Sequence, residues 1–265
     1  MEYTTLNNGI KIPMVGFGVY QIPARQTAAA VTTALNDGYR LIDTAEYYRN
    51  EREVGEAIRA SQIPRDQIFV TTKLPPQSSY EEAAKRIDES MAALDLGYID
   101  LMIIHWPGRA NVETYRTLED AQKAGKLRSI GLSSFYGRDY QEILDKCDIV
   151  PVLDQNETHV FRQQRDFQPV LEKNGTKLES WSPLAEGRHG VFRNPVLKSI
   201  GQAHGKSVAQ VILRYLVQRG IIVIPKSVHP SRIAENIDIF DFKLTDDEMS
   251  QIEALDEEKS AFGWY

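Results

Sequence analysis

The chain is poor in cysteine and has no long apolar stretch. Its single cysteine, Cys147, excludes an internal disulfide and favours a reducing compartment. No apolar run approaches the roughly 18–20 residues that a membrane span requires. Residues 1–5 lack the basic and apolar regions of a secretory signal. We therefore expect a cytoplasmic protein in which Cys147 is a structural thiol.

The chain also has no excess of positive charge, because its 31 basic residues are outnumbered by 37 acidic ones and the formal net charge is −6. This balance disfavours general binding to nucleic acid or to an anionic membrane. The sequence contains no phosphate-binding P-loop motif. Zinc-ligand spacing is absent among the five histidines, His105, His159, His189, His204 and His229. We expect no metal ion, no nucleic-acid partner and no membrane partner.

Short strand-like and helix-like segments alternate along the 265 residues, in a composition typical of globular proteins. One helix-like segment, 24–37, carries apolar residues at helical spacing, and another, 80–94, has a stripe of Ala84, Ile87, Met91 and Leu94. Parallel strands need crossover connections, which are usually helices. Eight strand–helix units predict an α/β protein with a (β/α)₈ TIM barrel, in one domain over 1–265. The strand candidates are 14–18, 40–43, 68–72, 101–105, 129–133, 150–154, 177–180 and 221–225.

Two segments fall outside this repeat. Residues 3–13 have two extended stretches around Asn7-Asn8-Gly9, which predicts an N-terminal β-hairpin placed to plug the bottom of the barrel. Residues 195–204 predict an extra helix before the helix at 207–219. Both additions leave the eight-unit repeat intact.

Polar, titratable residues stand at the ends of three consecutive strand candidates. Asp43, Lys73 and His105 end these segments, and Tyr48 follows the first of them. A barrel keeps its chemistry at the carboxyl ends of its strands. Taken singly, each residue could have a structural role, as a helix cap, a rim aromatic, a solvated strand end or a core histidine. Together they predict a tuned proton donor, which carbonyl reduction requires.

Four short motifs carry a family resemblance. They are Ile-Asp-Thr-Ala-Glu-Tyr-Tyr-Arg-Asn-Glu at 42–51, Thr-Lys at 72–73, Ile-His-Trp-Pro at 104–107 and Ile-Pro-Lys-Ser-Val at 224–228. In order and spacing they resemble the aldo-keto reductases, across essentially the whole chain. The chain looks most like bacterial and protist members that reduce small keto acids, keto sugars and reactive aldehydes. The resemblance implies a monomeric, NADPH-dependent oxidoreductase that reduces aldehydes, α-dicarbonyls and ketones to alcohols.

The resemblance also implies catalytic roles. Tyr48 would be the general acid that protonates the carbonyl oxygen, and His105 would orient that carbonyl. A free tyrosine titrates near ~10, and a nearby cation lowers this value, so Lys73 is expected to lower the pKa of Tyr48. A buried lysine without a counter-ion tends to lose its proton, so Asp43 would keep Lys73 charged. The hydride would come from a reduced nicotinamide.

The cofactor is not expected to bind through Gly16-Phe17-Gly18, which lacks the third glycine of a dinucleotide fingerprint. A barrel can instead hold phosphate with its last loops and a helix N-terminus, here near Pro230. The resemblance implies contacts to the 2′-phosphate end, the adenine and the nicotinamide. For the 2′-phosphate end they are Lys226, Ser227, Val228, His229 and Arg232. For the adenine they are Glu235 and Asn236. For the nicotinamide they are Ser133, Ser134, Gln155, Trp181, Ser182 and Leu184.

Three positions depart from the family pattern. Ser134 stands where asparagine is common, so one contact to the nicotinamide amide is lost or mediated by water. Asp154 also replaces a common asparagine and is expected to add negative charge beside Gln155. Pro75 stands where a tryptophan often follows the catalytic lysine, which alters one pocket wall.

The resemblance gives the substrate an aromatic mouth made of Tyr20, Tyr47 and Trp106. The connection 105–112 and the tail 256–265 are short, which predicts an open pocket and broad tolerance of small carbonyls. Whether residues 263–265 fold over the site or are disordered stays open. Two other functions also stay open: a Schiff-base aldolase using Lys73 or Lys226, and a redox sensor that binds NADPH without turnover.

Overall fold

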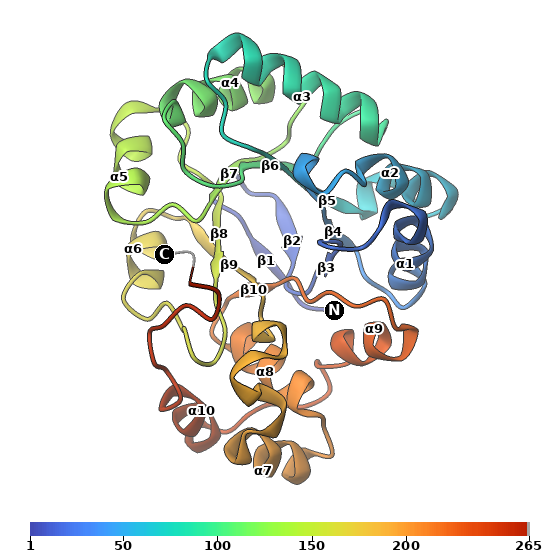
Figure 1. Cartoon of the computed structure of the whole chain (residues 1–265), viewed down its shortest axis with the longest axis vertical. Coiled ribbons are helices and arrows are strands. Elements are labelled where there is room, and N and C mark those ends of the chain that lie inside the picture. The colour runs from blue at the N-terminus through green and yellow to red at the C-terminus, as the bar shows by residue number, and fades with distance from the viewer. Residues whose placement is uncertain (264–265) are drawn as a thin grey trace.

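Eight parallel strands curl into the barrel that the sequence predicts (Figure 1). The computed structural model describes residues 1–263. Neighbouring strands pair in chain order, and a parallel bridge between Val15 and Val223 joins the first strand region to the last and so closes the barrel. The strands are β3 (Phe17–Gly18), β4 (Leu41–Asp43), β5 (Phe69–Leu74), β6 (Leu101–Ile104), β7 (Ile130–Ser133), β8 (Leu153–Glu157), β9 (Lys177–Trp181) and β10 (Ile222–Val223).

Helices surround the strands on the outside (Figure 1). They are α1 (Ala24–Asn36), α2 (Glu51–Ala60), α3 (Tyr80–Leu94), α4 (Asn111–Lys123), α5 (Gly137–Lys146), α6 (Gln168–Lys173), α8 (Val208–Gln218) and α9 (Pro230–Ile237), with α7 (Pro195–His204) and α10 (Asp246–Glu253) added to the repeat. The extra helix expected at 195–204 is therefore confirmed as α7. No helix within residues 1–263 is long and apolar enough to cross a membrane.

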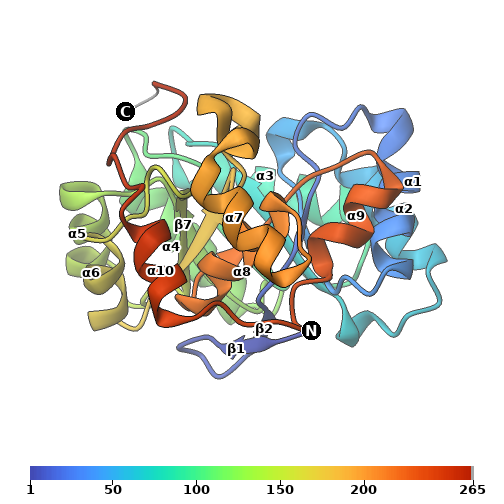
Figure 2. The same cartoon turned by 90° about the horizontal axis from the view of Figure 1, so that it is seen from below.

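The N-terminal hairpin closes the end of the barrel away from the strands' carboxyl ends. Strands β1 (Tyr3–Thr5) and β2 (Lys11–Pro13) pair antiparallel around the predicted Asn-Asn-Gly turn. Asn7 donates a hydrogen bond to the carbonyl of Pro151 (3.1 Å), and Asn8 donates one to Ser129 (3.0 Å), just before β8 and β7 begin. The chain after α10 runs to the opposite end of the molecule (Figure 2). The predicted plug is confirmed.

Element boundaries agree best where apolar spacing is regular. Helix α3 has the predicted bounds, and its buried stripe contains the predicted Ile87 and Leu94, with Ala83 and Ser90 in place of Ala84 and Met91. The strand expected at 150–154 is wrong by three residues and runs from Leu153 to Glu157. Its buried residues after Leu153 are polar, so an apolar pattern does not reveal them.

Candidate active site

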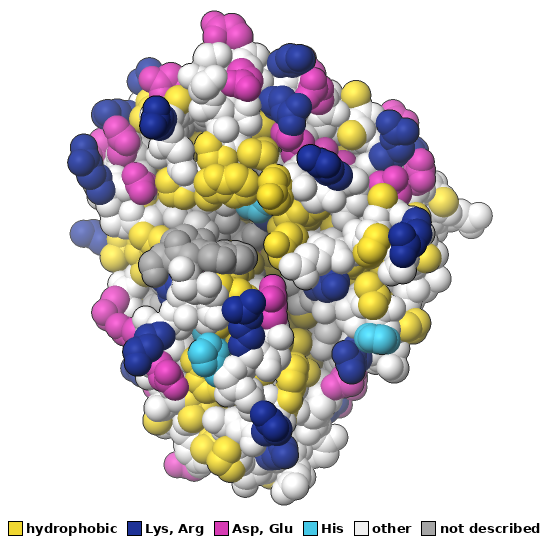
Figure 3. Space-filling model, viewed as in Figure 1, with side chains coloured by type: hydrophobic (Ala, Val, Ile, Leu, Met, Phe, Trp, Pro, Cys, Tyr) yellow, Lys and Arg dark blue, Asp and Glu magenta, His cyan; other side chains and the backbone are white. Residues whose placement is uncertain are grey.

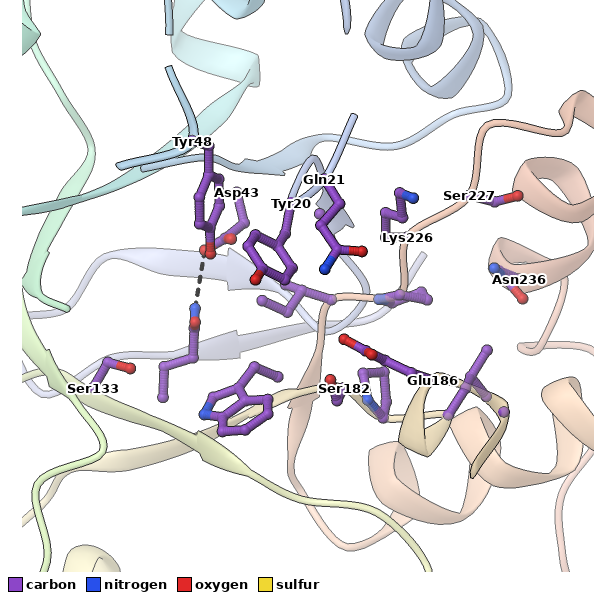
Figure 4. Close-up of a pocket in the computed structure, with 18 of the residues that line it drawn as sticks. Tyr20, Gln21, Asp43, Tyr48, Ser133, Ser182, Glu186, Lys226, Ser227 and Asn236 are labelled. Atoms are coloured by element: carbon purple, nitrogen blue, oxygen red, sulfur yellow. Dashed lines mark hydrogen bonds between the residues drawn. The ribbon is translucent and has the colours of Figure 1, made fainter. Parts of the chain in front are cut away.

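Two strand ends and one helical turn bring Asp43, Lys73 and Tyr48 together. Asp43 is the last residue of β4, and Lys73 lies near the end of the neighbouring β5. After β4 the chain forms a 3-10 turn, η1 (Glu46–Tyr48), which ends at Arg49 with a left-handed backbone (φ 56°). This turn returns Tyr48 over the strand ends, and Figure 4 shows Tyr48 and Asp43 at one end of the pocket.

Lys73 is the centre of the hydrogen-bond network. Its ammonium forms an ion pair with Asp43 and donates to the carbonyl of Thr44 (3.0 Å) and to the hydroxyl of Tyr48 (3.2 Å). The side chains of Lys73 and Asp43 are buried, with 0% and 2% of their surface exposed. All three ammonium hydrogens therefore have acceptors, and the cation is held against Tyr48.

The pKa of Tyr48 depends on two opposing effects, of which the sequence predicts only the one due to Lys73. Burial raises the pKa of Tyr48 to about 12, and the Lys73 ammonium offsets only part of that rise. The lowering expected from Lys73 is present, but the buried phenolate loses more solvation than one cation restores, so the net pKa is raised. Burial alone would lower the pKa of Lys73, but Asp43 and Tyr48 raise it above its usual value. At neutral pH the site thus holds a protonated tyrosine beside a charged lysine.

His105 follows β6 and lies against Tyr48, with their ring centroids 5.5 Å apart. Burial, and then the charge of Lys73, lower the pKa of His105 to about 2, so its imidazole is neutral. Its buried Nδ1 has no hydrogen-bond partner within residues 1–263. In the tautomer that carries its proton on Nε2, the neutral ring can donate one hydrogen bond into the pocket.

Aromatic rings surround this centre at the mouth of the barrel. Tyr20 lies 5.0 Å from Tyr48, and Trp106 lies 5.7 Å from Tyr47, measured between ring centroids. All three predicted substrate-contacting residues line the pocket, and Tyr47 is the most exposed of them at 62%. Hydrophobic side chains gather along one edge of the hollow in this face (Figure 3). The mouth therefore has an apolar, partly open binding surface beside the Tyr48 hydroxyl.

The pocket extends well beyond this mouth and has a volume of about 1360 Å³. Pockets for small ligands usually measure about 300–1,000 Å³, so this one can hold a dinucleotide together with a small substrate. Figure 4 shows Ser133 and Tyr48 at one end of it and Ser227 and Asn236 at the other. The predicted cofactor residues that line it are Ser133, Ser134, Gln155, Trp181, Ser182, Leu184, Lys226, Ser227, Arg232, Glu235 and Asn236.

Three residues lie elsewhere than the sequence suggests. Val228 and His229 are exposed and do not line the pocket, since the chain there turns outward to begin α9. Asp154 does not add charge beside Gln155, because successive residues of a strand point to opposite faces. Burial raises the pKa of Asp154 to about 8, so its carboxyl is largely protonated at neutral pH.

Several pocket residues have no counterpart among the sequence predictions. They come from the segments that follow β3, β7 and β9, including the 3-10 segment η3 (Ala185–Arg193), and from the start of α8. The backbone of Gln21 and Glu186 is left-handed (φ 58° and 49°), so their direction depends on irregular loops that no periodicity reveals. The residues are Gln21, Tyr136, Asp139, Glu186, Gly187, Phe192, Ser207, Val208 and Ala209.

The C-terminal segment reaches the mouth. The Phe262 ring lies 5.3 Å from the Trp181 ring, and the backbone N–H of Ala261 donates to Glu157 (2.7 Å). The question left open by the sequence, whether residues 263–265 fold over the site, concerns Trp264 and Tyr265, which lie outside the described residues. Phe262 therefore packs against the pocket residue Trp181, although the described part of the tail does not itself line the pocket.

A closed parallel barrel with a buried phenol–ammonium–carboxylate set at its mouth defines an enzyme of the (β/α)₈ class. The model of the aldo/keto reductase family matches residues 14–257, and the chain belongs to this family. The resemblance seen in the sequence is confirmed, and the protein is an oxidoreductase.

Known proteins are similar along nearly the full length. Morphine 6-dehydrogenase of Pseudomonas putida is 42% identical over 95% of this chain and 90% of its own. Glyoxal reductase of Bacillus subtilis is 40% identical over 96% of this chain and 92% of its own. The crystal structure of an aldo/keto reductase from Brucella melitensis superposes with a TM-score of 0.92 at 42% identity, covering 96% of this chain and 99% of that one.

Proposed function

We propose that the protein reduces small aldehydes, α-dicarbonyls and ketones to alcohols with NADPH as the reductant. The observation that carries this proposal is the hydrogen bond between the Tyr48 hydroxyl and the Lys73 ammonium at the inner end of a dinucleotide-sized pocket. That pair can release a proton to a carbonyl oxygen and stabilise the phenolate left behind. Membership of a reductase family supports the same reaction.

Each of the four catalytic side chains has its own role in proton transfer. Tyr48 donates its hydroxyl proton to the carbonyl oxygen, and Lys73 stabilises the charge that remains on the phenol oxygen. Asp43 keeps Lys73 protonated in its buried position. Neutral His105 donates a second hydrogen bond that orients the carbonyl. A buried, ion-paired ammonium is a poor nucleophile, so the arrangement disfavours a Schiff base at Lys73.

The pocket fits a phosphorylated dinucleotide. Lys226 and Arg232 line the pocket, and among residues 1–263 neither forms an ion pair. Figure 4 shows Lys226 on the side of the pocket toward Ser227. The first turn of α9 has no side-chain cap from His229, but the N–H groups of Arg232 and Ile233 already donate to the His229 carbonyl (3.0 Å each), so the two cationic side chains would be the main contacts to an anion. Gln155 and Trp181 line the end near Tyr48, where a nicotinamide would be held. When bound, the reduced nicotinamide supplies the hydride that no side chain can provide.

The open aromatic mouth favours small, planar carbonyl compounds. We expect turnover with both methylglyoxal and a simple aromatic aldehyde, because Tyr47 and Trp106 offer apolar contact without enclosing the substrate. The name of the Bacillus subtilis relative, glyoxal reductase, supports an α-dicarbonyl substrate. The measurement is NADPH oxidation with each compound. Selectivity for a single bulky ketone would contradict the open-mouth interpretation, and tight NADPH binding without any turnover would favour the redox sensor.

Replacing Arg232 by alanine should weaken NADPH binding by about ten- to a hundredfold and leave NADH binding nearly unchanged. A charge-assisted hydrogen bond contributes about 1.5–3 kcal/mol, and only NADPH carries the 2′-phosphate. Binding of each cofactor is measured by fluorescence titration. Arg25→Ala is the matched control, since Arg25 is exposed on α1 and does not line the pocket. Equal weakening of both cofactors by Arg232→Ala would contradict the assignment.

A further inference from the structure

Glu179 is a fully buried carboxyl group inside the barrel that the proposed mechanism does not use. It lies on β9, two residues before Trp181, so both side chains point to the same inner face. Its Cα pairs in register with that of Gln155 on β8. A second acid therefore lies directly beneath the proposed nicotinamide end of the pocket.

One amide group connects Glu179 to the catalytic network. The Nε2 atom of Gln155 donates to Asp43 Oδ2 at 2.9 Å and to Glu179 Oε2 at 2.7 Å. An amide nitrogen carries two hydrogens, so both are used. The remaining oxygen of Glu179, Oε1, is buried and has no hydrogen-bond partner in the described part of the chain. Glu179 thus lies two hydrogen bonds from the carboxylate that holds Lys73.

Glu179 has one anionic and one cationic neighbour on the surrounding strands. Asp43 on β4 and Lys73 on β5 act on it, Gln155 on β8 is uncharged, and the paired residue Ile222 on β10 is apolar. With Glu179 protonated, one carboxylate balances one ammonium. With Glu179 ionised, the cluster has a net negative charge in a buried place, where charges interact strongly.

We propose that Glu179 is a positioning residue whose protonation sets the net charge around Tyr48 and thereby limits carbonyl reduction at alkaline pH. An added negative charge holds the Tyr48 proton more tightly, which slows its transfer to the substrate. Burial, and then the charge of Asp43, raise the pKa of Glu179 to about 8. The charge therefore changes within the range of an ordinary assay. This inference rests on the proposed reductase function.

The test is the pH profile of kcat/KM for methylglyoxal reduction at saturating NADPH. We expect the wild-type value to fall severalfold between about pH 7 and pH 9, by at most about tenfold for each pKa unit added to the proton donor. Glu179→Gln keeps an acceptor oxygen for Gln155 and has no proton to lose, so its profile should lack this fall.

Asp154→Asn is the matched control. Asp154 is another fully buried carboxyl whose pKa burial raises to about 8, but it lies on the opposite face of β8 from Gln155. This variant should keep the wild-type fall. A fall that persists in Glu179→Gln, or one that disappears in Asp154→Asn, would overturn the assignment.

The wild-type profile tests the inference without any variant, because a flat profile between about pH 7 and pH 9 rejects it. Infrared titration of the buried carboxyl bands in Asp154→Asn gives a second readout if Glu179→Gln does not fold. A carboxyl that is already ionised at neutral pH would overturn the inference. Turnover with a flat profile rejects only the role of Glu179, whereas no turnover with any carbonyl rejects the proposed function and this inference with it.

Discussion

Tyr48→Phe should lower kcat for carbonyl reduction by about 10²–10⁴-fold, the contribution typical of a positioned general acid. The substitution removes only the hydroxyl that Lys73 contacts at 3.2 Å. The phenyl ring can keep its contacts with Tyr20 and His105. Binding of NADPH should therefore remain near the wild-type value. The measurement is steady-state NADPH oxidation with methylglyoxal, combined with fluorescence titration of NADPH.

The neighbouring tyrosine provides the comparison. Tyr47 precedes Tyr48 in the same turn, but its ring is 62% exposed, and Lys73 donates to Tyr48 rather than to it. Tyr47→Phe should keep turnover within about tenfold of wild type, because it removes no proton donor from the Lys73 network. If Tyr47→Phe abolishes turnover while Tyr48→Phe does not, the proton donor has been assigned to the wrong residue.

The placement of the site could be predicted because it follows from the fold. Asp43, Lys73 and His105 each end an apolar run, and parallel strands bring their carboxyl ends to one face of a barrel. A pattern of short apolar segments therefore suffices to place such residues together. Tyr48 is brought to them by a turn after β4, and only the spacing of the family motif indicates which of the two tyrosines faces inward.

The electrostatic balance could not be predicted in the same way. The sequence indicates a cation near Tyr48 and hence a lowered pKa, whereas burial raises that pKa to about 12. The sign depends on how completely the surrounding strands exclude water, which is a tertiary property. Tyr48 therefore stays protonated at neutral pH, and the effect of Lys73 is realised when negative charge develops on the phenol oxygen.

Glu179 and Gln21 show which buried or pocket residues can be predicted from the sequence and which cannot. Glu179 interrupts the apolar residues of β9, and a charged residue within a predicted buried strand is a visible signal. Gln21 gives no such signal, because it enters the pocket through a left-handed loop residue after β3. Residues placed by regular elements can be anticipated, and residues placed by irregular loops require the structure.

Asp43→Asn should lower the free energy of unfolding by about 3–5 kcal/mol, because it leaves the buried Lys73 without its counter-ion. It should also lower kcat by about 10–1,000-fold, since an unpaired buried lysine tends to lose its proton and Tyr48 then loses its cation. Chemical denaturation measures the first effect, and NADPH oxidation with methylglyoxal measures the second.

The pH dependence of the variant identifies the cause. In the wild type the pKa of Lys73 is raised, so its contribution to stability is complete below the unfolded value near ~10.4 and is lost only as the pH rises through the folded value. In Asp43→Asn the folded pKa of Lys73 should lie below the unfolded value. The unfolded state then binds the extra proton, and the difference in stability from wild type should shrink as the pH rises.

Asp100→Asn separates catalytic loss from general destabilisation. Asp100 is also buried (2% exposed) and pairs with Arg65 at 2.7 Å and Arg128 at 3.2 Å, but it precedes β6 at the hairpin end of the barrel. This variant should also lose stability, though less than Asp43→Asn because Arg65 and Arg128 are partly exposed (20% and 42%), and it should keep kcat near the wild-type value. If both variants lose kcat to the same extent, the loss results from a destabilised barrel. If only Asp43→Asn loses kcat, the Asp43 carboxylate acts on Tyr48 through Lys73.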